Sequence, residues 1–311
     1  MSWKPVIAIV GAGAVGGYYG ARLAQHGHAV HFLLRSEYES VRRSGMVVRS
    51  CSGNFTLPPD SLHIYNDVGR MPKVDLVIVT LKCTSNDQYE PLIRPLLDDR
   101  TMILTLQNGL GNEQRLAELF GAERVFGGLC NVCINRGDGG VIHHLANGLI
   151  RFGDFIQHTQ PTERAAQLVG LLTECGIPSE VLPSLAKGRW EKLVWNIPFN
   201  GLGAVLNLTT DVIIGSPWGL AMVRRIMEEV IAAAAGSQVS LDPAVIDFNL
   251  NRTKGMGAYK SSMQIDRQLS RPMEIEAILG EPVRAAKRSA VDTPHMAMLY
   301  EMAKLVEMGS L

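Results

Sequence analysis

The sequence has no surplus of charge of either sign, because 30 lysines and arginines are balanced by 30 aspartates and glutamates. Proteins that bind nucleic acids or anionic membranes usually present a basic surplus. We therefore expect neither a nucleic acid nor a membrane among the partners of this chain. With 46% hydrophobic and 19% charged residues, the composition is ordinary for a globular protein, and a small-molecule partner fits it better.

The chain also lacks an uninterrupted apolar run of about 20 residues, the length that a membrane-spanning helix requires. The apolar segment 6–15 is broken by glycines and is followed by no convincing cleavage site, which argues against a secretory signal. The five cysteines are an odd number, which favours free thiols in a reducing cytoplasm. Cys130 and Cys133 have the spacing of a redox or metal pair, but no second pair accompanies them, so no metal site is predicted.

The 311 residues are enough for two domains, and the sequence changes character between its halves. In the first half, helical segments alternate with short apolar runs at 6–10, 29–34, 75–81, 101–106 and 125–130. This succession is typical of a doubly wound parallel sheet. After about Gln160 the pattern predicts helices at 162–175, 185–199, 217–236, 258–269, 273–289 and 295–308. We predict an α/β fold, with an N-terminal Rossmann domain over residues 1–160 and an all-α C-terminal domain over residues 161–311.

A glycine-rich turn of the pattern G-x-G-x-x-G follows the first predicted strand and opens a helix. In this context the pattern is typical of a dinucleotide-binding site. Gly11 would permit the tight turn, Gly13 would let a pyrophosphate approach the backbone, and Gly16 would let the helix pack on the strand. The N–H groups and the dipole at the helix N-terminus favour phosphate. The predicted cofactor-binding residues of this turn are Gly11, Ala12, Gly13, Ala14, Val15 and Gly16.

The end of the second predicted strand indicates which dinucleotide would bind. NAD enzymes usually carry an acidic residue there, which accepts hydrogen bonds from the ribose hydroxyls. Residues 29–35 contain no acid, and Arg35 stands at that position. A guanidinium suits a 2′-phosphate, so the predicted cofactor is NADP (NADPH). The alternative is that Arg35 is an ordinary exposed charge in a loop.

Lys82 and Asn108 each follow the end of a predicted strand, where ligands bind in open α/β sheets. Either side chain suits a phosphate, a ribose, an amide or a substrate, although an ordinary loop role for each is equally open. In the second half, Lys192, Asn196 and Asn200 are spaced i, i+4 and i+8, which places them on one face of a helix. The rest of that helix is apolar, so a buried polar stripe would be costly unless it faced a wet cleft or a ligand.

Two further features of the second half can be interpreted in more than one way. Pro198 lies within the predicted helix and would remove a backbone donor and kink it. A second polar cluster contains Ser262, which can donate to a carboxylate, and the acidic residues Glu274 and Glu276 after a helix break. Either carboxylate could simply stabilise a helix N-terminus.

Taken together, these motifs resemble the ketopantoate reductase family over almost the whole chain. The residues that carry the resemblance are the glycine-rich turn 11–16, Thr80-Leu81-Lys82, Gln107-Asn108-Gly109, Lys192-Leu193 with Asn196 and Asn200, and Ser261-Ser262-Met263 with Glu274. The resemblance implies NADPH-dependent reduction of 2-dehydropantoate to pantoate in pantothenate synthesis. It also makes a 2-keto acid the expected substrate and a homodimer a conceivable assembly.

The resemblance assigns roles to the matching residues. Lys192 is expected to protonate the forming alkoxide as the general acid, and Glu274 to lie near the nicotinamide ribose and tune the site. Asn196 and Asn200 are expected to bind the substrate hydroxyl end, and Ser262 its carboxylate. The remaining expected contacts are Asn108, with cofactor and substrate, and Lys82 and the backbone of Ile134, with the cofactor.

Two departures leave the substrate shape open. Where relatives can carry another substrate-contacting asparagine, this chain has Thr210, with Asn207 three positions earlier. Pro198 is also outside the expected pattern. Two other functions remain alternatives: a related reductase of another small keto or hydroxy acid, and a non-catalytic NADP sensor. The intact stripe of Lys192, Asn196 and Asn200 argues against the sensor, because a sensor need not keep an acid.

Overall fold

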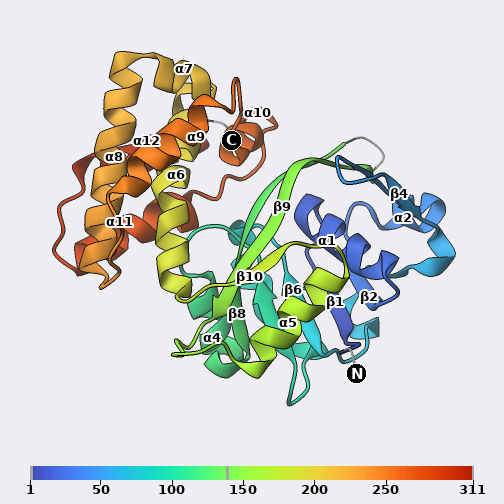
Figure 1. The fold of residues 1–311 in the computed structure, drawn as a ribbon. Helices are drawn as coiled ribbons and strands as arrows, with labels where there is room; N and C mark the ends of the chain where they lie inside the picture. Colours follow the sequence, from blue (N-terminus) through green and yellow to red (C-terminus); the bar gives the residue numbers. More distant parts are fainter. Residues whose placement is uncertain (1–2, 138–139, 310–311) are drawn as a thin grey trace. The chain divides into compact units, whose positions relative to one another are not determined.

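A computed structural model describes residues 3–137 and 140–309 of the chain. The chain divides into two compact units. The first consists of Met1–Gln107 with Asn112–Leu185, and the second of Asn108–Gly111 with Ala186–Leu311. Figure 1 colours the chain from blue to red, and the sheet lies in the first unit while the second is helical.

The first unit is built on one sheet in which ten strands are described. Its order is β4-β3-β9-β8-β7-β6-β1-β2-β5, and β10 pairs with β9. The strand bounds are β1 Val6–Val10, β2 Ala29–Leu33, β3 Met46–Ser50, β4 Phe55–Leu57, β5 His63–Tyr65, β6 Leu76–Val79, β7 Met102–Thr105, β8 Val125–Arg136, β9 Ile142–Asp154 and β10 Ser179–Val181.

Parallel pairing in the centre of the sheet confirms the predicted Rossmann arrangement. Strand β1 pairs in parallel with β2 and β6, and β7 pairs in parallel with β6 and β8. Alternate residues of β1 enter different cores, with Ile7 and Ile9 in one and Ala8 and Val10 in the other. A strand buried on both faces must be apolar at every position, which is why 6–10 reads as a continuous apolar run.

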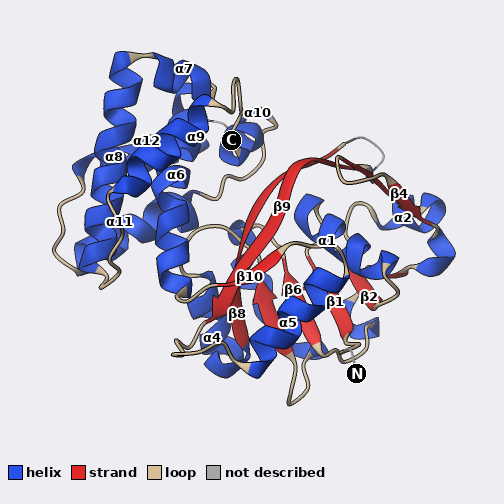
Figure 2. Ribbon diagram, in the orientation of Figure 1, coloured by secondary structure: helices blue, strands red, loops and turns tan. Residues whose placement is uncertain are grey.

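Two strand pairs of this sheet are antiparallel. Strand β3 pairs antiparallel with β4, and β8 pairs antiparallel with β9 in a long hairpin that is drawn in red in Figure 2. Strand β9 was not predicted, and β8 extends beyond the predicted run at 125–130. More than half of the positions in these two strands are polar or partly exposed, so neither strand reads as a continuous apolar run.

Helices cover both faces of the sheet in this unit. The core that contains Ile7 and Ile9 also takes residues of α1 and α5, and the core that contains Ala8 and Val10 takes residues of α3 and α4. The α-helices are α1 Ala14–Gln25, α2 Tyr38–Ser44, α3 Tyr89–Ile93, α4 Asn112–Phe120 and α5 Glu163–Glu174. Short 3-10 segments are η1 Pro59–Ser61, η2 Val68–Arg70, η3 Cys83–Gln88, η4 Arg94–Leu96 and η5 Ala122–Arg124.

The boundary between the units falls later than the predicted 160/161 position. Helix α5 was expected to open the helical domain, but Leu168, Leu171 and Leu172 pack into the core of the sheet. Strand β10 then pairs in parallel with β9. This short strand is only partly buried and has little apolar signal, so the sequence did not reveal that the chain returns to the sheet before it enters the helical unit.

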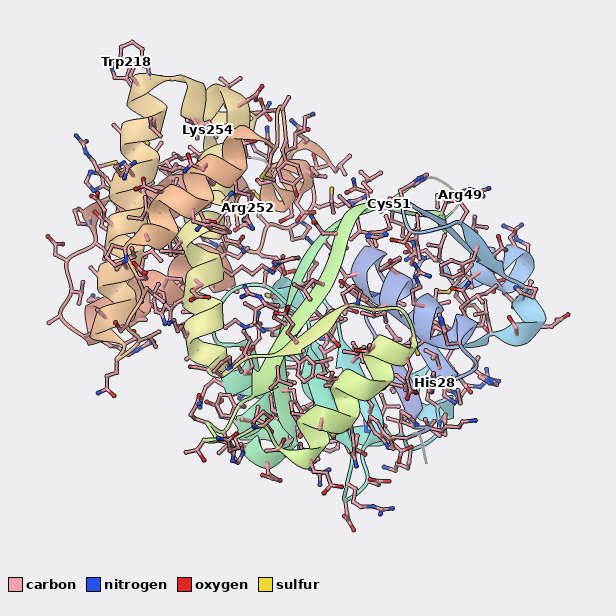
Figure 3. The ribbon with its side chains drawn as sticks, in the orientation of Figure 1. His28, Arg49, Cys51, Trp218, Arg252 and Lys254 are labelled. Atoms are coloured by element: carbon pink, nitrogen blue, oxygen red, sulfur yellow. The ribbon has the colours of Figure 1, made fainter. Side chains whose placement is uncertain are left out.

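The second unit packs its helices around a single core. Its elements are α6 Leu185–Leu206, α7 Thr210–Gly215, α8 Pro217–Gly236, α9 Ala244–Lys254, α10 Ser262–Gln268, the π-helical turn η7 Glu276–Gly280, α11 Glu281–Arg288 and α12 Pro294–Met308. Helix α8 begins as predicted, because Ser216 accepts a hydrogen bond from the N–H of Gly219 and Pro217 occupies the first helical position. The side chain of Trp218 in this first turn is exposed (Figure 3).

Other helix predictions needed correction. The helix expected at 258–269 begins only at Ser262, because Ser261 caps it by accepting from the N–H of Gln264. The helix expected at 273–289 contains the π-helical turn, and α7 and α9 were not predicted at all. Among the described residues, none of the helices has the length and hydropathy to cross a membrane. The same residues contain no cluster suited to a metal ion, and the five cysteines form no disulfide with one another.

A buried histidine on β2, the strand next to the edge strand β5, predicts how stability depends on pH. His31 stacks on His63 with ring centroids 4.8 Å apart, and its Nδ1 lies 3.0 Å from the Tyr65 hydroxyl. Burial, together with the neighbouring His63, lowers the pKa of His31 from 6.5 to about 4. The unfolded chain therefore takes up this proton first, and the stability present above pH 6.5 should be lost as the pH falls towards 4.

The expected loss from this one group is at most about 3 kcal/mol. Urea unfolding of the natural chain and of His31→Phe, measured across this interval, should show a shallower pH dependence for the variant. His158→Gln, which removes an exposed histidine, serves as the control and should keep the natural slope. Identical slopes for His31→Phe and the natural chain would show that His31 is not the group responsible.

Candidate functional site

The glycine-rich turn connects the end of β1 to the start of α1 and packs directly against the chain that follows β6. Gly11 has a φ of +96°, which only glycine adopts readily, and a Cβ there would lie 2.5 Å from the backbone N of Leu81. The hydroxyl of Thr80 donates to the carbonyl of Gly11 at 2.6 Å. The turn is therefore held by contacts between two neighbouring strand ends.

The other two glycines differ in what surrounds them. A Cβ on Gly16 would lie 2.2 Å from Oγ1 of Thr80 and 2.8 Å from the carbonyl oxygen of Gly11, so the close packing of α1 requires glycine. Gly13 is exposed, and a Cβ there would meet only the carbonyl oxygen of Gly11, at 3.9 Å. Packing within the chain therefore does not explain Gly13, whereas close approach of a ligand would.

The first turn of α1 favours an anion. Its N-cap, Gly13, makes no side-chain hydrogen bond, and the first turn contains no acidic residue. The backbone N–H groups at such an end are available for phosphate oxygens. Lys82 is exposed directly after Leu81, the residue on which Gly11 packs, and it begins η3. Arg35 is exposed two residues beyond the end of β2.

Strand β8 contains Ile134, an expected contact of the cofactor, and Arg136, which contacts the glycine-rich turn. Ile134, an expected backbone contact of the cofactor, is partly buried and pairs with His144 across an irregular stretch of the β8–β9 ladder. Arg136 was not among the expected residues, yet its Nη1 donates to the carbonyl of Ala12 within the turn at 2.6 Å. Nothing in the sequence pointed to Arg136, because the contact joins positions 124 residues apart.

The second unit contains the predicted polar stripe on α6. Nζ of Lys192 donates to Oδ1 of Asn108 at 2.8 Å, so a residue from the loop after β7 meets the catalytic candidate of α6. This loop is anchored by the N–H of Leu110, which donates to the carbonyl of Ala277 at 2.9 Å. Gly109 has a φ of +85°, and a Cβ there would lie 2.3 Å from the same carbonyl oxygen.

The two asparagines of the stripe are buried, with 7% of Asn196 and 3% of Asn200 exposed. Oδ1 of Asn200 accepts from the hydroxyl of Ser262 at 3.2 Å and from the N–H of Met263 at 3.3 Å. Both lone pairs of this oxygen are thereby used, and the amide N–H groups are what Asn200 has left to offer a ligand. Helix α6 continues through Pro198 to Leu206, well beyond the predicted end.

The two acidic residues of the second polar cluster, Glu274 and Glu276, differ in how far they are buried. Glu276 lies half exposed in a network with Arg284, at 2.9 Å, and the hydroxyl of Tyr300, at 3.0 Å. Partial burial would raise the pKa of Glu276, but its hydrogen bonds with these two residues outweigh that effect and lower it. Glu274 is only 6% exposed and lies three residues before Ala277, which anchors the loop of Asn108. Glu276 is thus part of a surface ion-pair network, and Glu274 is the buried carboxylate.

The two candidates for an additional substrate contact both make contacts inside the helical unit. Thr210 is buried, and its hydroxyl donates to the carbonyl of Gly257 at 3.0 Å. Oδ1 of Asn207 accepts from Gln268 at 2.7 Å and from Gln264 at 3.4 Å. These bonds tie α7 and the end of α6 to the segment around α10, which is a structural role for both residues.

The structure thus collects the predicted residues into two groups. In the first unit, the glycine turn and Lys82 surround the start of α1, with Arg35 beyond the end of the neighbouring strand β2. In the second unit, Lys192 contacts Asn108 and Ser262 contacts Asn200, and the same unit also contains the buried side chains of Asn196 and Glu274. These predicted residues form a set with a cation, amides, a hydroxyl and a carboxylate. Such a set can orient a small polar molecule and deliver a proton to it.

Two family models match the chain over most of its length. The model described as ketopantoate reductase PanE/ApbA matches residues 7–157. The model described as the C-terminal part of ketopantoate reductase PanE/ApbA matches residues 184–307. The two matches correspond closely to the sheet unit and the helical unit.

Individual relatives agree with the family models. The 2-dehydropantoate 2-reductase of Nostoc sp. is 41% identical over 303 residues, which cover 96% of this chain and 94% of the relative. The crystal structure of 2-dehydropantoate 2-reductase from Geobacter metallireducens has a TM-score of 0.92 and 45% identity, with 96% and 99% of the two chains covered. The enzyme of the same name from Methylococcus capsulatus has a TM-score of 0.88 and 33% identity, with 98% and 97% covered.

The close packing at Gly16 generates a prediction for stability. Gly16→Ala introduces a Cβ that must displace both the Thr80 side chain and the backbone of Gly11. We expect a loss of about 1–3 kcal/mol in the free energy of unfolding, measured by urea denaturation. Gly170→Ala is the matched control, because this glycine lies inside α5 with no atom within 4 Å of an added Cβ. It should be neutral or stabilising by up to about 1 kcal/mol, and an equal loss in both variants would contradict this explanation.

Proposed function

The chain belongs to the ketopantoate reductase family of oxidoreductases, and from this premise we propose that it reduces 2-dehydropantoate to pantoate with NADPH. This reaction would serve pantothenate synthesis. The observation that carries the proposal is the hydrogen bond from Lys192 to Asn108, beside two buried amides on the same helix face. It supplies a proton donor and polar positioning groups in one place.

The first unit fits a dinucleotide cofactor. Gly13 leaves open space over the turn, and the uncapped start of α1 offers N–H groups to a pyrophosphate. Arg35 and Lys82 would add positive charge at the neighbouring strand ends, and an exposed guanidinium beyond β2 supports NADPH as the cofactor. When bound, NADPH supplies the hydride of the reaction. The protein then has to supply a proton and a fixed substrate geometry.

Lys192 is proposed as the group that supplies the proton. Its ammonium donates to Oδ1 of Asn108, and this hydrogen bond directs Nζ. A carbonyl oxygen that gains negative charge would be stabilised by this cation and then protonated by it. The buried carboxylate of Glu274 is proposed to lie near the nicotinamide ribose and to tune the same site.

The amides and the hydroxyl are proposed to hold the two ends of the substrate. Asn196 and Asn200 would bind the hydroxyl end, with Asn200 acting as a donor because its oxygen already accepts two hydrogen bonds. Ser262 is proposed to bind the substrate carboxylate. Its hydroxyl proton, which points to Asn200, would have to turn towards that carboxylate.

A direct assay tests the proposed function. The purified chain is mixed with NADPH and ketopantoate, or with a panel of branched 2-keto acids, and the disappearance of NADPH is followed. We expect the highest kcat/KM with ketopantoate. A higher value with another acid would assign the chain to a related reductase. Binding of NADPH without turnover of any acid would favour a sensor and refute the proposal.

Replacement of the proposed acid should lower the rate of the chemical step. We expect Lys192→Ala to reduce kcat by about 10²- to 10⁴-fold, the usual contribution of general acid catalysis, because the proton is transferred in the transition state. The affinity for NADPH should change little, since the phosphates are expected to bind at residues 11–16. Lys187→Ala removes an exposed lysine of the same helix and should retain activity. A rise in KM at constant kcat would mean that Lys192 only holds the substrate.

Arg35 should determine which dinucleotide is preferred. Arg35→Asp places a carboxylate where the 2′-phosphate is expected, so repulsion should weaken NADPH binding far more than NADH binding. Titration of both dinucleotides against the natural chain and the variant measures this difference. Equal changes in the two dissociation constants would remove Arg35 from the recognition of the 2′-phosphate.

A further inference from the structure

A partly buried ion pair next to the glycine turn has no role in the reaction described above. The guanidinium of Arg136 is only 14% exposed and lies between the turn and the segment after β2. Its Nη1 donates to the carbonyl of Ala12 and lies 3.6 Å from Oε2 of Glu37. All three residues belong to the first unit, so this geometry is internal to it.

The surroundings of Arg136 leave its charge incompletely balanced. Nε and Nη2 are buried and have no hydrogen-bond partner among the described residues. Burial lowers the pKa of Arg136, and the negative charge of Glu37 opposes this effect. A guanidinium nevertheless stays protonated in proteins. The site therefore contains a largely buried cation whose ion-pair partner, within residues 3–137 and 140–309, is Glu37. A cation in that situation favours additional negative charge nearby.

Glu37 lies close to the position that commonly distinguishes NAD from NADP in Rossmann units. It lies two residues after Arg35 and four residues after Leu33, the last residue of β2. An acidic residue beyond the second strand of a Rossmann unit commonly accepts hydrogen bonds from the adenosine ribose, which favours NAD and repels a 2′-phosphate. Glu37 is thus an acidic residue near this position. Without a countercharge it would repel the 2′-phosphate of NADPH, the coenzyme proposed for this chain.

We infer that the Arg136–Glu37 pair is a determinant of coenzyme specificity, in which Arg136 holds and neutralises Glu37 so that the site accepts a 2′-phosphate. Arg136 acts here as a positioning residue, through Glu37 and the carbonyl of Ala12. The inference deepens the proposed function and rests on it, because it concerns NADPH as the coenzyme. In this inference, Glu37 would repel the 2′-phosphate if it were unpaired, whereas Arg35, two residues away, would attract it.

Dissociation constants for NADPH and NADH, measured without substrate, test the inference in a double-mutant cycle. In Arg136→Gln the carboxylate of Glu37 is released, so the dissociation constant for NADPH should rise by about tenfold or more. That for NADH should change by less than about threefold. The double variant Arg136→Gln/Glu37→Gln should return the NADPH value to within about threefold of the natural chain, because the repelling charge is gone.

A single variant and a control complete the experiment. Glu37→Gln alone keeps Arg136 and should bind NADPH as tightly as the natural chain or more tightly, and it stays informative if Arg136→Gln fails to fold. Arg49→Gln removes an exposed arginine of the same unit, which is labelled in Figure 3, and should leave both constants unchanged. NADH binding by each variant also shows that the turn is folded.

Several results would overturn the inference. Equal weakening of both dinucleotides in Arg136→Gln would mean that Arg136 only supports the turn. A double variant as weak as Arg136→Gln would mean that Arg136 acts on the phosphate and not through Glu37. Weaker NADPH binding by Glu37→Gln would contradict the repulsion directly. Failure of the proposed function is distinguishable in the natural chain itself. Binding of NADPH no tighter than that of NADH would refute the proposed coenzyme, whereas tight NADPH binding without turnover of a keto acid would refute the proposed reaction and leave the coenzyme inference open to the same test.

Discussion

The hydrogen bond between Lys192 and Asn108 is the contact on which the arrangement of the helical unit and the chemistry proposed for it depend. Lys192 belongs to a helix whose neighbouring residues are almost all buried, and a cation in such a place needs an acceptor. Asn108 provides that acceptor from a four-residue loop that is far away in the sequence. The loop in turn is fixed on the carbonyl of Ala277, so one chain of contacts connects α6, the loop and the segment of Glu274.

Buried polar groups need hydrogen-bond partners, and this requirement also explains how the other polar groups are arranged. The carboxamide oxygen of Asn200 is buried, and it accepts two hydrogen bonds at the start of α10. The helix start and the asparagine therefore satisfy one another, and the orientation of the amide follows. In the first unit, the carbonyl of Ala12 receives Nη1 of Arg136 in a similar way. Polar groups that are proposed to bind ligands are thus also structural, which limits how they can be changed.

Sequence reasoning succeeded where the signal is local. The turn at 11–16 was recognisable because strand, glycines and helix follow each other directly, and steric contacts at Gly11 and Gly16 explain two of the three glycines. Helix α8 was placed correctly from its Ser-Pro start. The stripe of Lys192, Asn196 and Asn200 was visible because helical periodicity alone puts these side chains on one face.

What the sequence by itself determined was therefore the class of fold, the dinucleotide turn and the composition of the polar stripe, since each depends on residues within a few positions of one another. The tertiary structure alone decided which partners those groups meet. It paired Lys192 with Asn108, separated the buried Glu274 from the surface carboxylate Glu276, and returned α5 and β10 to the sheet. It also brought Arg136 to Ala12 and Glu37, because pairing of β8 with β9 and β7 folds distant segments together, and no local pattern records such a contact.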